Sequence, residues 1–220
     1  MSIGHAGARA LMPLIVGIGG TLRDGSTSER ALRIALGEAE RLGARTRIFA
    51  GQLLNLTAYD PAERNRGGAA AELVDALRGA DGIIIATPSY HGSISGLIKN
   101  AIDYTEDLRA DARVYFSDRA VGTIVCADGI QAMGSTLATL RAIVHALRGW
   151  PTPFSAVINS ALRPFTADGK CADPQVAQQL AFVAEQVVAF AQMRRLYEAT
   201  PAMADEPVTR VREEKSAASR

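Results

Sequence analysis

The sequence predicts an α/β fold, a three-layer α/β/α sandwich in which helices cover both faces of a five-stranded parallel sheet. Short apolar runs bounded by Gly, Pro or Asp recur along the chain, and segments of helical period lie between them. Runs of that length without polar alternation are typical of strands buried on both faces. Strict alternation of strands and helices requires right-handed crossovers, which build a doubly wound sandwich. Five strands favour the order 2-1-3-4-5.

Each element can be placed from its pattern and its flanking residues. The predicted strands span residues 14–18, 46–50, 82–86, 121–126 and 154–158, of which the second and fifth have weaker apolar runs. The predicted helices span residues 29–42, 69–79, 94–107, 135–147 and 174–196. We expect Ser28 to cap the first helix, Gly43 to end it and Pro174 to open the last one.

The composition is that of a globular chain with one domain. Its 220 residues are 48% hydrophobic and 21% charged, which is enough for one sizeable core. Because 24 Lys and Arg residues balance 23 Asp and Glu residues, the net charge is only +1. Such a chain has no global field that favours nucleic acid or an anionic membrane, so we expect neither as a partner.

The cysteines and histidines restrict the possible chemistry. Two cysteines, Cys126 and Cys171, cannot form a disulfide framework, and the three histidines show no metal-ligand spacing. Cys126 ends a predicted strand and is interpreted as a buried small hydrophobe, not as a nucleophile. This usage fits a reducing environment, so we expect a cytoplasmic protein without a metal.

Residues 13–198 are predicted to form the domain, with residues 1–12 as a disordered N-terminal arm. Residues 199–220 are polar and mixed in charge, and are predicted to be a disordered tail or a partner-docking arm. The first apolar stretch is short, is interrupted by Pro13 and lacks a cleavage site, so no signal peptide is expected. No run in the sequence approaches the roughly 20 apolar residues that span a bilayer.

Three loops are expected at the ligand-binding edge of the sheet, because ligands of open α/β sheets bind outside the carboxyl ends of the strands. They are residues 19–28, 87–96 and 127–134, and all are rich in Gly, Ser, Thr or Asp. The first has the composition of a phosphate-binding loop, with glycines, hydroxyls, a helix N-terminus and the cation of Arg23. The alternative is a capped turn with one solvated arginine.

Three familiar phosphate motifs do not fit the first loop. A dinucleotide fingerprint beginning at Gly17 would need Gly where Leu22 stands, and no acidic residue ends the second strand. A P-loop beginning at Gly20 would need Lys where Ser26 stands. A cysteine phosphatase would need a thiolate, which this loop lacks. What remains is a site that holds a monophosphate without transferring it.

The second and third loops suggest contacts to a planar ligand. Tyr90 and His91 offer a flat surface with hydrogen-bonding groups, although His91 alone is equally compatible with an exposed turn. In the third loop, backbone N–H groups near Gly129 are placed to face a developing negative charge, and Gln131 to reach the ligand or a neighbouring subunit. Asp128 is either a ligand contact or an ordinary turn residue.

The second loop and the helix after it carry a longer pattern. Residues 87–104 read TPSYHGSISGLIKNAIDY and resemble PEYNGSxxGxLKNAIDW, the signature of the NADPH-dependent FMN reductase family of the flavodoxin-like superfamily. Ser89 replaces Glu, His91 replaces Asn and Tyr104 replaces Trp. The first loop, from Gly20 to Ser26, is similar to the family's phosphate loop, G(S/T)xRxxS. The resemblance covers residues 14–196.

This resemblance implies a flavodoxin-like fold with FMN and NADPH or NADH as cofactors. The residues implied to hold the FMN phosphate are Thr21, Arg23, Ser26 and Ser28. Those implied to frame the flavin ring are Pro88, Ser89, Tyr90, His91, Gly92 and Ser93, and those at its pyrimidine end are Asp128, Gly129 and Gln131. The resemblance also implies that hydride would pass from the nicotinamide to flavin N5 while backbone donors of the third loop would stabilise the charge at N1 and O2, so no catalytic acid or base is expected.

The resemblance implies an NAD(P)H:FMN oxidoreductase and leaves its electron acceptor open. Residues 134–137 and 147–153 look like FMN reductases that serve two-component monooxygenases, so the first hypothesis is a reductase that supplies reduced flavin to such a partner. The second is a reductase that retains FMN and reduces quinones, azo compounds or metal oxyanions.

Two further hypotheses are weaker. A non-enzymatic flavodoxin-type carrier is disfavoured by the near-neutral charge, because such carriers dock through acidic faces. A phosphoacceptor domain would need Asp where Thr87 stands, and we drop that hypothesis. The resemblance alone implies a homodimer or a homotetramer.

Overall fold

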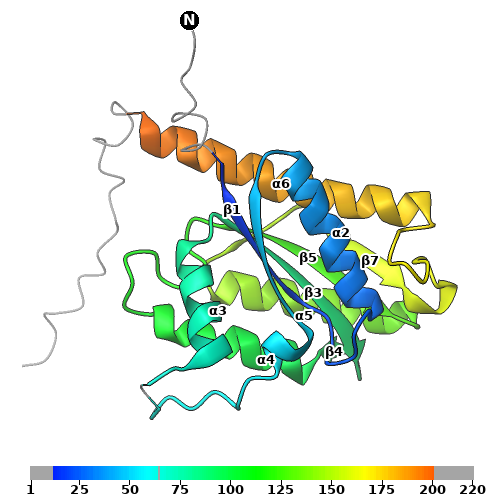
Figure 1. The fold of residues 1–220 in the computed structure, drawn as a ribbon, viewed down its shortest axis with the longest axis horizontal. Coiled ribbons are helices and arrows are strands. Elements are labelled where there is room, and N and C mark those ends of the chain that lie inside the picture. Colours follow the sequence, from blue (N-terminus) through cyan, green and yellow to red (C-terminus); the bar gives the residue numbers. More distant parts are fainter. Residues whose placement is uncertain (1–11, 64, 201–220) are drawn as a thin grey trace, which may run out of the picture.

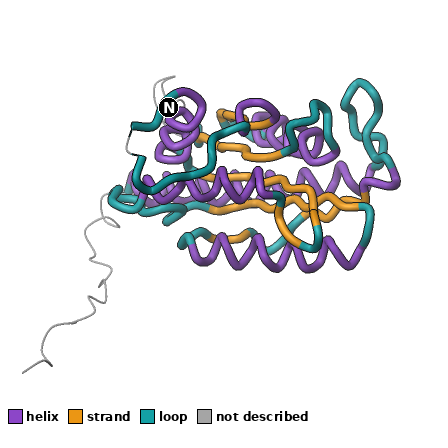
Figure 2. Tube along the Cα trace, turned by 90° about the horizontal axis from the view of Figure 1, so that it is seen from below, coloured by secondary structure: helices purple, strands orange, loops and turns teal. Residues whose placement is uncertain are grey.

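The computed structural model describes residues 12–63 and 65–200, which form three layers with a sheet between two layers of helices (Figures 1 and 2). The predicted N-terminal arm and polar tail lie outside the described residues, apart from Met12, Ala199 and Thr200. The three-layer prediction is confirmed.

The sheet has seven strands, and its parallel strands follow the order β2-β1-β3-β5-β6. Its long strands are β1 (Leu14–Gly19), β2 (Arg45–Ala50), β3 (Gly82–Tyr90) and β5 (Ala120–Ala127). The predicted order is confirmed, but two short strands share its fifth position. These are β6 (Trp150–Pro151) and β7 (Ala156–Asn159), which both pair with β5. Pro153 lies between them and, without an N–H group, cannot continue the ladder.

The helices are α2 (Thr27–Arg41), α3 (Gly68–Gly79), α4 (Gly96–Asp103), α5 (Ile130–Ala146) and α6 (Pro174–Ala199). Helices α2 and α6 pack on one face of the sheet, and α3, α4 and α5 pack on the other. Short 3-10 turns follow β2 (Gly51–Leu54), α4 (Tyr104–Leu108) and β7 (Ser160–Leu162). In the described part of the chain no helix is long and apolar enough to cross a membrane.

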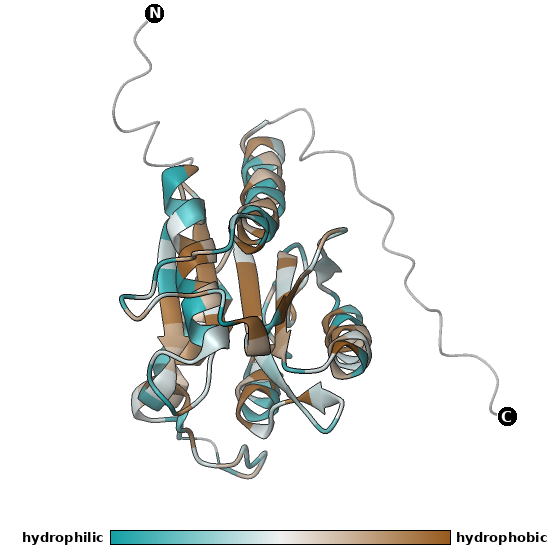
Figure 3. Cartoon of the chain, turned by 90° about the vertical axis from the view of Figure 1, so that its right-hand side faces the viewer, coloured by the Kyte–Doolittle hydropathy of each residue, from teal (hydrophilic) through white to brown (hydrophobic). Residues whose placement is uncertain are grey.

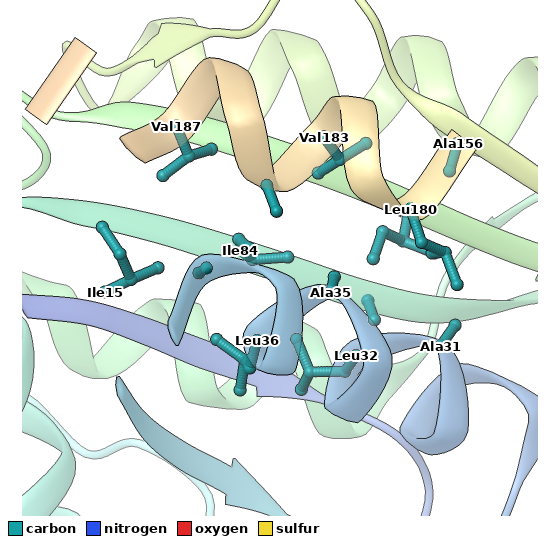
Figure 4. Packing of buried hydrophobic residues seen from close by; sticks show 14 of the residues in the cluster. Ile15, Ala31, Leu32, Ala35, Leu36, Ile84, Ala156, Leu180, Val183 and Val187 are labelled. Atoms are coloured by element: carbon teal, nitrogen blue, oxygen red, sulfur yellow. The ribbon is translucent and has the colours of Figure 1, made fainter. Parts of the chain in front are cut away.

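Alternation along the strands divides the core into two clusters. Ile15 of β1 and Ile84 of β3 point to the α2 and α6 side, as Figure 4 shows, whereas Val16 and Ile83 point to the opposite side. Neighbouring residues of a strand point to opposite faces, so apolar residues at every position bury both faces. Hydrophobic colour accordingly concentrates between the layers (Figure 3).

Several predicted boundaries were wrong near the ligand-binding edge. The first helix begins at Thr27 and is capped by Ser26, so the predicted cap at Ser28 is incorrect. Helix α5 begins at Ile130, five residues earlier than predicted, because the exposed Gly134 is accommodated within the helix. A glycine inside a helix costs only about 1 kcal/mol relative to alanine, which tertiary packing offsets.

The third strand and the helix after it also differ from the prediction. Strand β3 continues to Tyr90 and turns back into the two-residue strand β4 (Ser93–Ile94). Helix α4 therefore begins at Gly96, where the side chain of Ser95 accepts a hydrogen bond from the Ile98 amide. The second loop is thus an extension of the sheet, which makes its backbone more defined than an open loop.

Helix α6 approaches the sheet closely at Gly122 of β5. A Cβ atom added at Gly122 would lie 2.6 Å from Cγ1 of Val183 and 2.9 Å from Cγ2 of Val187. Real Cβ atoms do not approach other carbon atoms so closely, so the strand can pack against this helix only because it carries glycine there. The spacing between the α6 layer and the sheet depends on this contact.

We expect Gly122→Ala to lower the free energy of unfolding by about 1–3 kcal/mol, because an extra methyl overfills a packed core. Urea denaturation measures this change. The loss should be smaller in a Val183→Ala background, where the nearer of the two contacted methyl groups is missing. Gly37→Ala on the exposed side of α2 is the control, since nothing lies within 4 Å of its added Cβ; it should be neutral or stabilising. Equal losses in both variants would contradict the close-packing argument.

Candidate functional site

A pocket of about 180 Å³ lies at the carboxyl ends of β1, β3 and β5. Three separate segments of the chain form its walls: the loop into α2, the end of β3, and the end of β5 with the loop after it. A fourth contact comes from the turn after β7. The lining residues are Thr21, Arg23, Ser26, Thr27, Ser28, Pro88, Ser89, Tyr90, Cys126, Ala127, Asp128 and Ser160.

The first wall is shaped by a capping box at the start of α2. The Oγ of Ser26 accepts a hydrogen bond from the amide of Glu29 (3.3 Å), and the carboxylate of Glu29 accepts one from the amide of Gly25 (3.0 Å). An ion pair of 2.8 Å to Arg33 balances the charge of Glu29. These bonds fix the loop backbone before any ligand binds. The Ser26-x-x-Glu29 spacing is the signal that identifies the true cap.

Ser28 carries the clearest sign of a ligand in this pocket. Its side chain is buried, with 1% of the residue exposed, and its Oγ has no hydrogen-bond partner among the described residues. A buried polar atom without a partner costs about 1–3 kcal/mol, so folded proteins rarely retain one without a reason. An oxygen-rich ligand in the pocket would supply the missing partner.

The surroundings of Ser28 suit an anion. The N–H groups at the start of α2 precede its first i→i−4 hydrogen bond, and the helix dipole adds partial positive charge there. Arg23 lines the same pocket, is exposed, and forms no ion pair within the described part of the chain. Thr21 holds the loop in a local turn, since its Oγ1 accepts from the Arg23 amide (3.1 Å). The donor set fits a phosphate group.

The second wall is the hairpin of β3 and β4. Tyr90 pairs with Ser93, which leaves a two-residue turn of His91 and Gly92 with φ values of 52° and 77°. Two positive φ angles are typical of a type I′ hairpin, in which an Asn-Gly pair is most common. His91 adopts the same conformation, so its difference from the family signature leaves the turn intact.

The third wall follows β5. Asp128 lines the pocket, Gly129 is the extended N-cap residue of α5, and Gln131 lies in the first turn of that helix. Burial raises the pKa of the Cys126 thiol to about 12. A thiol with this pKa stays protonated at neutral pH and is a poor nucleophile. The interpretation of Cys126 as a buried small hydrophobe is confirmed.

The structure brings most of the predicted site residues into one pocket and leaves others at its margin. His91, Gly92 and Ser93 form the hairpin turn, and Gly129 and Gln131 begin α5; none of these five lines the pocket. The sequence reasoning missed lining residues in two segments that it had otherwise examined, namely Thr27 and Ala127. It also missed Ser160, which follows β7 at the same edge of the sheet. The sequence could have indicated Ser160, because the loop after the fifth predicted strand also lies at the carboxyl end of a parallel strand.

A larger hollow of about 810 Å³ lies on the α3 side, beside Tyr59 and Arg66, away from this pocket. Its charged groups already have partners: Arg66 pairs with Asp107 at 2.8 Å and stacks over the Tyr59 ring at 4.7 Å. The three arginines that line this hollow are all paired with carboxylates, whereas the smaller pocket contains an unpaired hydroxyl and an unpaired cation. We therefore place the site at the smaller pocket.

We expect Ser28→Ala to leave the stability of the ligand-free protein unchanged or slightly higher, because the removed oxygen makes no hydrogen bond. Ser26→Ala should lower the free energy of unfolding by about 1 kcal/mol, because it removes the helix cap. Urea denaturation of both variants tests the contrast. A loss in Ser28→Ala as large as that in Ser26→Ala would show that the Ser28 hydroxyl has a partner in the protein.

Comparison with known proteins agrees with this geometry. The family model described as NADPH-dependent FMN reductase matches residues 13–162. FMN-dependent NADPH-azoreductase from Staphylococcus aureus is 40% identical over 82 residues, which are 37% of this chain and 40% of that protein. The chain thus matches less than half the length of this curated relative.

Solved structures extend the likeness of the fold. An NADH:FMN oxidoreductase (EMOB) in its apo form is 21% identical, with a TM-score of 0.61 over 87% of this chain and 94% of that one. The flavoenzyme FerB from Paracoccus denitrificans, an NAD(P)H:acceptor oxidoreductase, is 22% identical, with a TM-score of 0.64 over 83% and 98%. The TM-scores of these two structures support the flavodoxin-like fold. The family model covers well over half of the chain. The chain belongs to the NADPH-dependent FMN reductase family.

Proposed function

We propose that this protein is an NAD(P)H-dependent FMN reductase that binds FMN in the pocket at the carboxyl ends of β1, β3 and β5. The observation that carries the proposal is the unpaired, buried hydroxyl of Ser28 beside the unpaired guanidinium of Arg23 at a helix N-terminus. Family membership and the names of the related reductases support the same assignment.

The phosphate of FMN would bind at the start of α2. Ser28 would donate its hydroxyl proton, and Arg23 would add a charge-assisted hydrogen bond. Thr21 would donate to the phosphate by giving up its hydrogen bond to the carbonyl oxygen of Arg23 (3.2 Å). Ser26 uses an oxygen lone pair for the cap, so its hydroxyl proton remains for a phosphate oxygen. Ser160, which lines the pocket from the turn after β7, would add a further hydroxyl. This donor set neutralises and orients the phosphate without a catalytic group that would transfer it.

The remaining walls would hold the flavin ring. Pro88, Ser89 and Tyr90 line the pocket, and His91, Gly92 and Ser93 continue that wall into the hairpin turn. Asp128, Gly129 and Gln131 would face the pyrimidine end. When bound, FMN supplies the redox chemistry, because its ring accepts hydride from a reduced nicotinamide. The protein contributes position and backbone donors, and the Cys126 thiol takes no part.

Two fates of the electrons are proposed alongside. In one, reduced flavin leaves for a flavin-dependent monooxygenase, as the resemblance of residues 134–137 and 147–153 implies. In the other, FMN stays bound and the protein reduces quinones, azo compounds or metal oxyanions, which the match to an FMN-dependent azoreductase favours. A homodimer or homotetramer is part of the proposal on the basis of the family alone.

We expect Arg23→Ala to weaken FMN binding by about 1.5–3 kcal/mol, the loss of one charge-assisted hydrogen bond. Quenching of flavin fluorescence during titration measures the dissociation constant. Arg41→Ala is a matched control, since Arg41 lies at the other end of α2 and pairs with Glu38. Unchanged FMN affinity in Arg23→Ala would remove the phosphate assignment.

The activity can be tested with flavin-free protein, by following NADPH and NADH oxidation while FMN is raised from zero. A rate that rises hyperbolically with FMN in excess of enzyme indicates a diffusible flavin substrate, as supply to a monooxygenase requires. A rate that saturates at one FMN per subunit and depends on an added quinone or azo compound indicates a retained cofactor. Absence of oxidation under both conditions would contradict the proposed enzyme and favour an electron carrier.

A further inference from the structure

The hairpin of β3 and β4 is attached to α5 by side-chain hydrogen bonds to α5 residues that do not line the pocket. The Oγ of Ser89 donates to the carbonyl oxygen of Ala132 (3.0 Å) and lies 2.6 Å from Oγ1 of Thr136. Because a serine hydroxyl has one proton, Thr136 is left as the donor in the second bond. Nearer the turn, the Oγ of Ser135 lies 2.9 Å from the carbonyl oxygen of Gly92, which is the shortest of its three possible hydrogen bonds; the other two, to Ala132 (3.2 Å) and Gln131 (3.5 Å), are within α5.

This hairpin depends on such attachments. Strand β4 has two residues, and the pairs Ser89–Ile94 and Tyr90–Ser93 are its whole antiparallel ladder. A two-stranded ribbon is marginal in water even when it is longer, so neighbouring structure must hold it. Thr136 is fully buried, so water cannot replace its bond to Ser89. The position of the hairpin therefore depends on α5.

The same helix begins at the opposite wall of the pocket. Asp128 precedes the N-cap of α5 and lines that wall, while Ser89 and Tyr90 line the hairpin wall. Neither Ser135 nor Thr136 lines the pocket itself. The sheet joins the two walls directly as far as the pair Pro88–Cys126, and the hairpin beyond that pair has no ladder to β5. Past this point α5 contacts both walls, so the two hydroxyls help to fix the distance between the surfaces expected to enclose a flavin ring.

We propose that Thr136 and Ser135 are positioning residues that hold the hairpin at the separation required by the flavin ring. The proposal rests on the proposed function, and it assigns a task to two residues outside the family signature. Their hydroxyls position the wall at the ring end of the site, while the start of α2 binds the phosphate end of the ligand. Changes at the two ends therefore have distinct effects on ligands with and without a phosphate.

The test compares FMN with riboflavin, which has the same ring and no phosphate. Thr136→Val keeps the side-chain shape and removes the hydroxyl. It should weaken the binding of both flavins by a similar factor of about fivefold, as expected for one buried neutral hydrogen bond. Arg23→Ala should weaken the binding of FMN and leave the binding of riboflavin unchanged. Fluorescence titration gives the four dissociation constants. The absorption spectrum and reduction potential of bound FMN should also shift in Thr136→Val.

Two control variants separate positioning from general damage to α5. Thr136→Ser retains the hydroxyl and should restore wild-type affinity. Thr139→Ala removes a hydroxyl that bonds within α5, to the carbonyl oxygen of Ser135 (3.0 Å), and should leave both affinities and the flavin spectrum unchanged. If Thr136→Val does not fold, as judged by circular dichroism, Ser135→Ala at an exposed position gives the same comparison with a smaller loss.

The outcomes distinguish this inference from the proposed function. If the wild-type protein bound neither flavin, the proposed function itself would be wrong. If the wild-type protein bound FMN, and Thr136→Val and Ser135→Ala bound both flavins as tightly as wild type, the positioning role alone would be overturned. Loss of FMN affinity with unchanged riboflavin affinity in Thr136→Val would also overturn it, because the effect would then lie at the phosphate end.

Discussion

Burial of both faces of the parallel sheet is the constraint on which the rest of the structure depends. Every residue of β5 is buried, and its internal polar side chain, Thr123, has a hydrogen-bond partner in Ser155 at 2.7 Å. In a sheet enclosed in this way, a polar side chain without a hydrogen-bond partner would lower the stability of the fold. Polar groups collect at the strand ends, and parallel strands bring their carboxyl ends to a single edge. The pocket lies at that edge.

The candidate site uses the start of a helix in two ways. Ser26 accepts a hydrogen bond from the Glu29 amide, and Glu29 accepts one from the Gly25 amide in the loop before the helix, which stabilises the loop without a ligand. Ser28, two residues beyond the cap, lines the pocket, and its buried hydroxyl has no partner in the described chain. The two serines therefore differ in role. Ser26 caps the helix and preorganises the loop, whereas the hydroxyl of Ser28 is free for the ligand of the proposed function.

Helix α5 links the two other walls of the pocket. Its first turn follows Asp128, and one turn later Thr136 holds the end of β3 through Ser89. Packed helices move as rigid bodies, so the separation of the walls does not depend on the short hairpin alone. Rigid elements hold a binding geometry more precisely than loops do. The hairpin of β3 and β4 is therefore held in place by its hydrogen bonds to a packed helix.

The sequence by itself determined the alternation of strands and helices, the strand order and the three loops that carry the site, because burial on both faces and turn residues leave a local pattern. It also pointed to Arg23, Ser26 and Tyr90, since strand ends and glycine-rich turns can be recognised locally. The tertiary structure decided which serine caps α2, that β3 extends into a hairpin, that Ser160 lines the pocket, and that Thr136 contacts Ser89. Those facts depend on contacts between residues far apart in the chain, and local periodicity does not record such contacts.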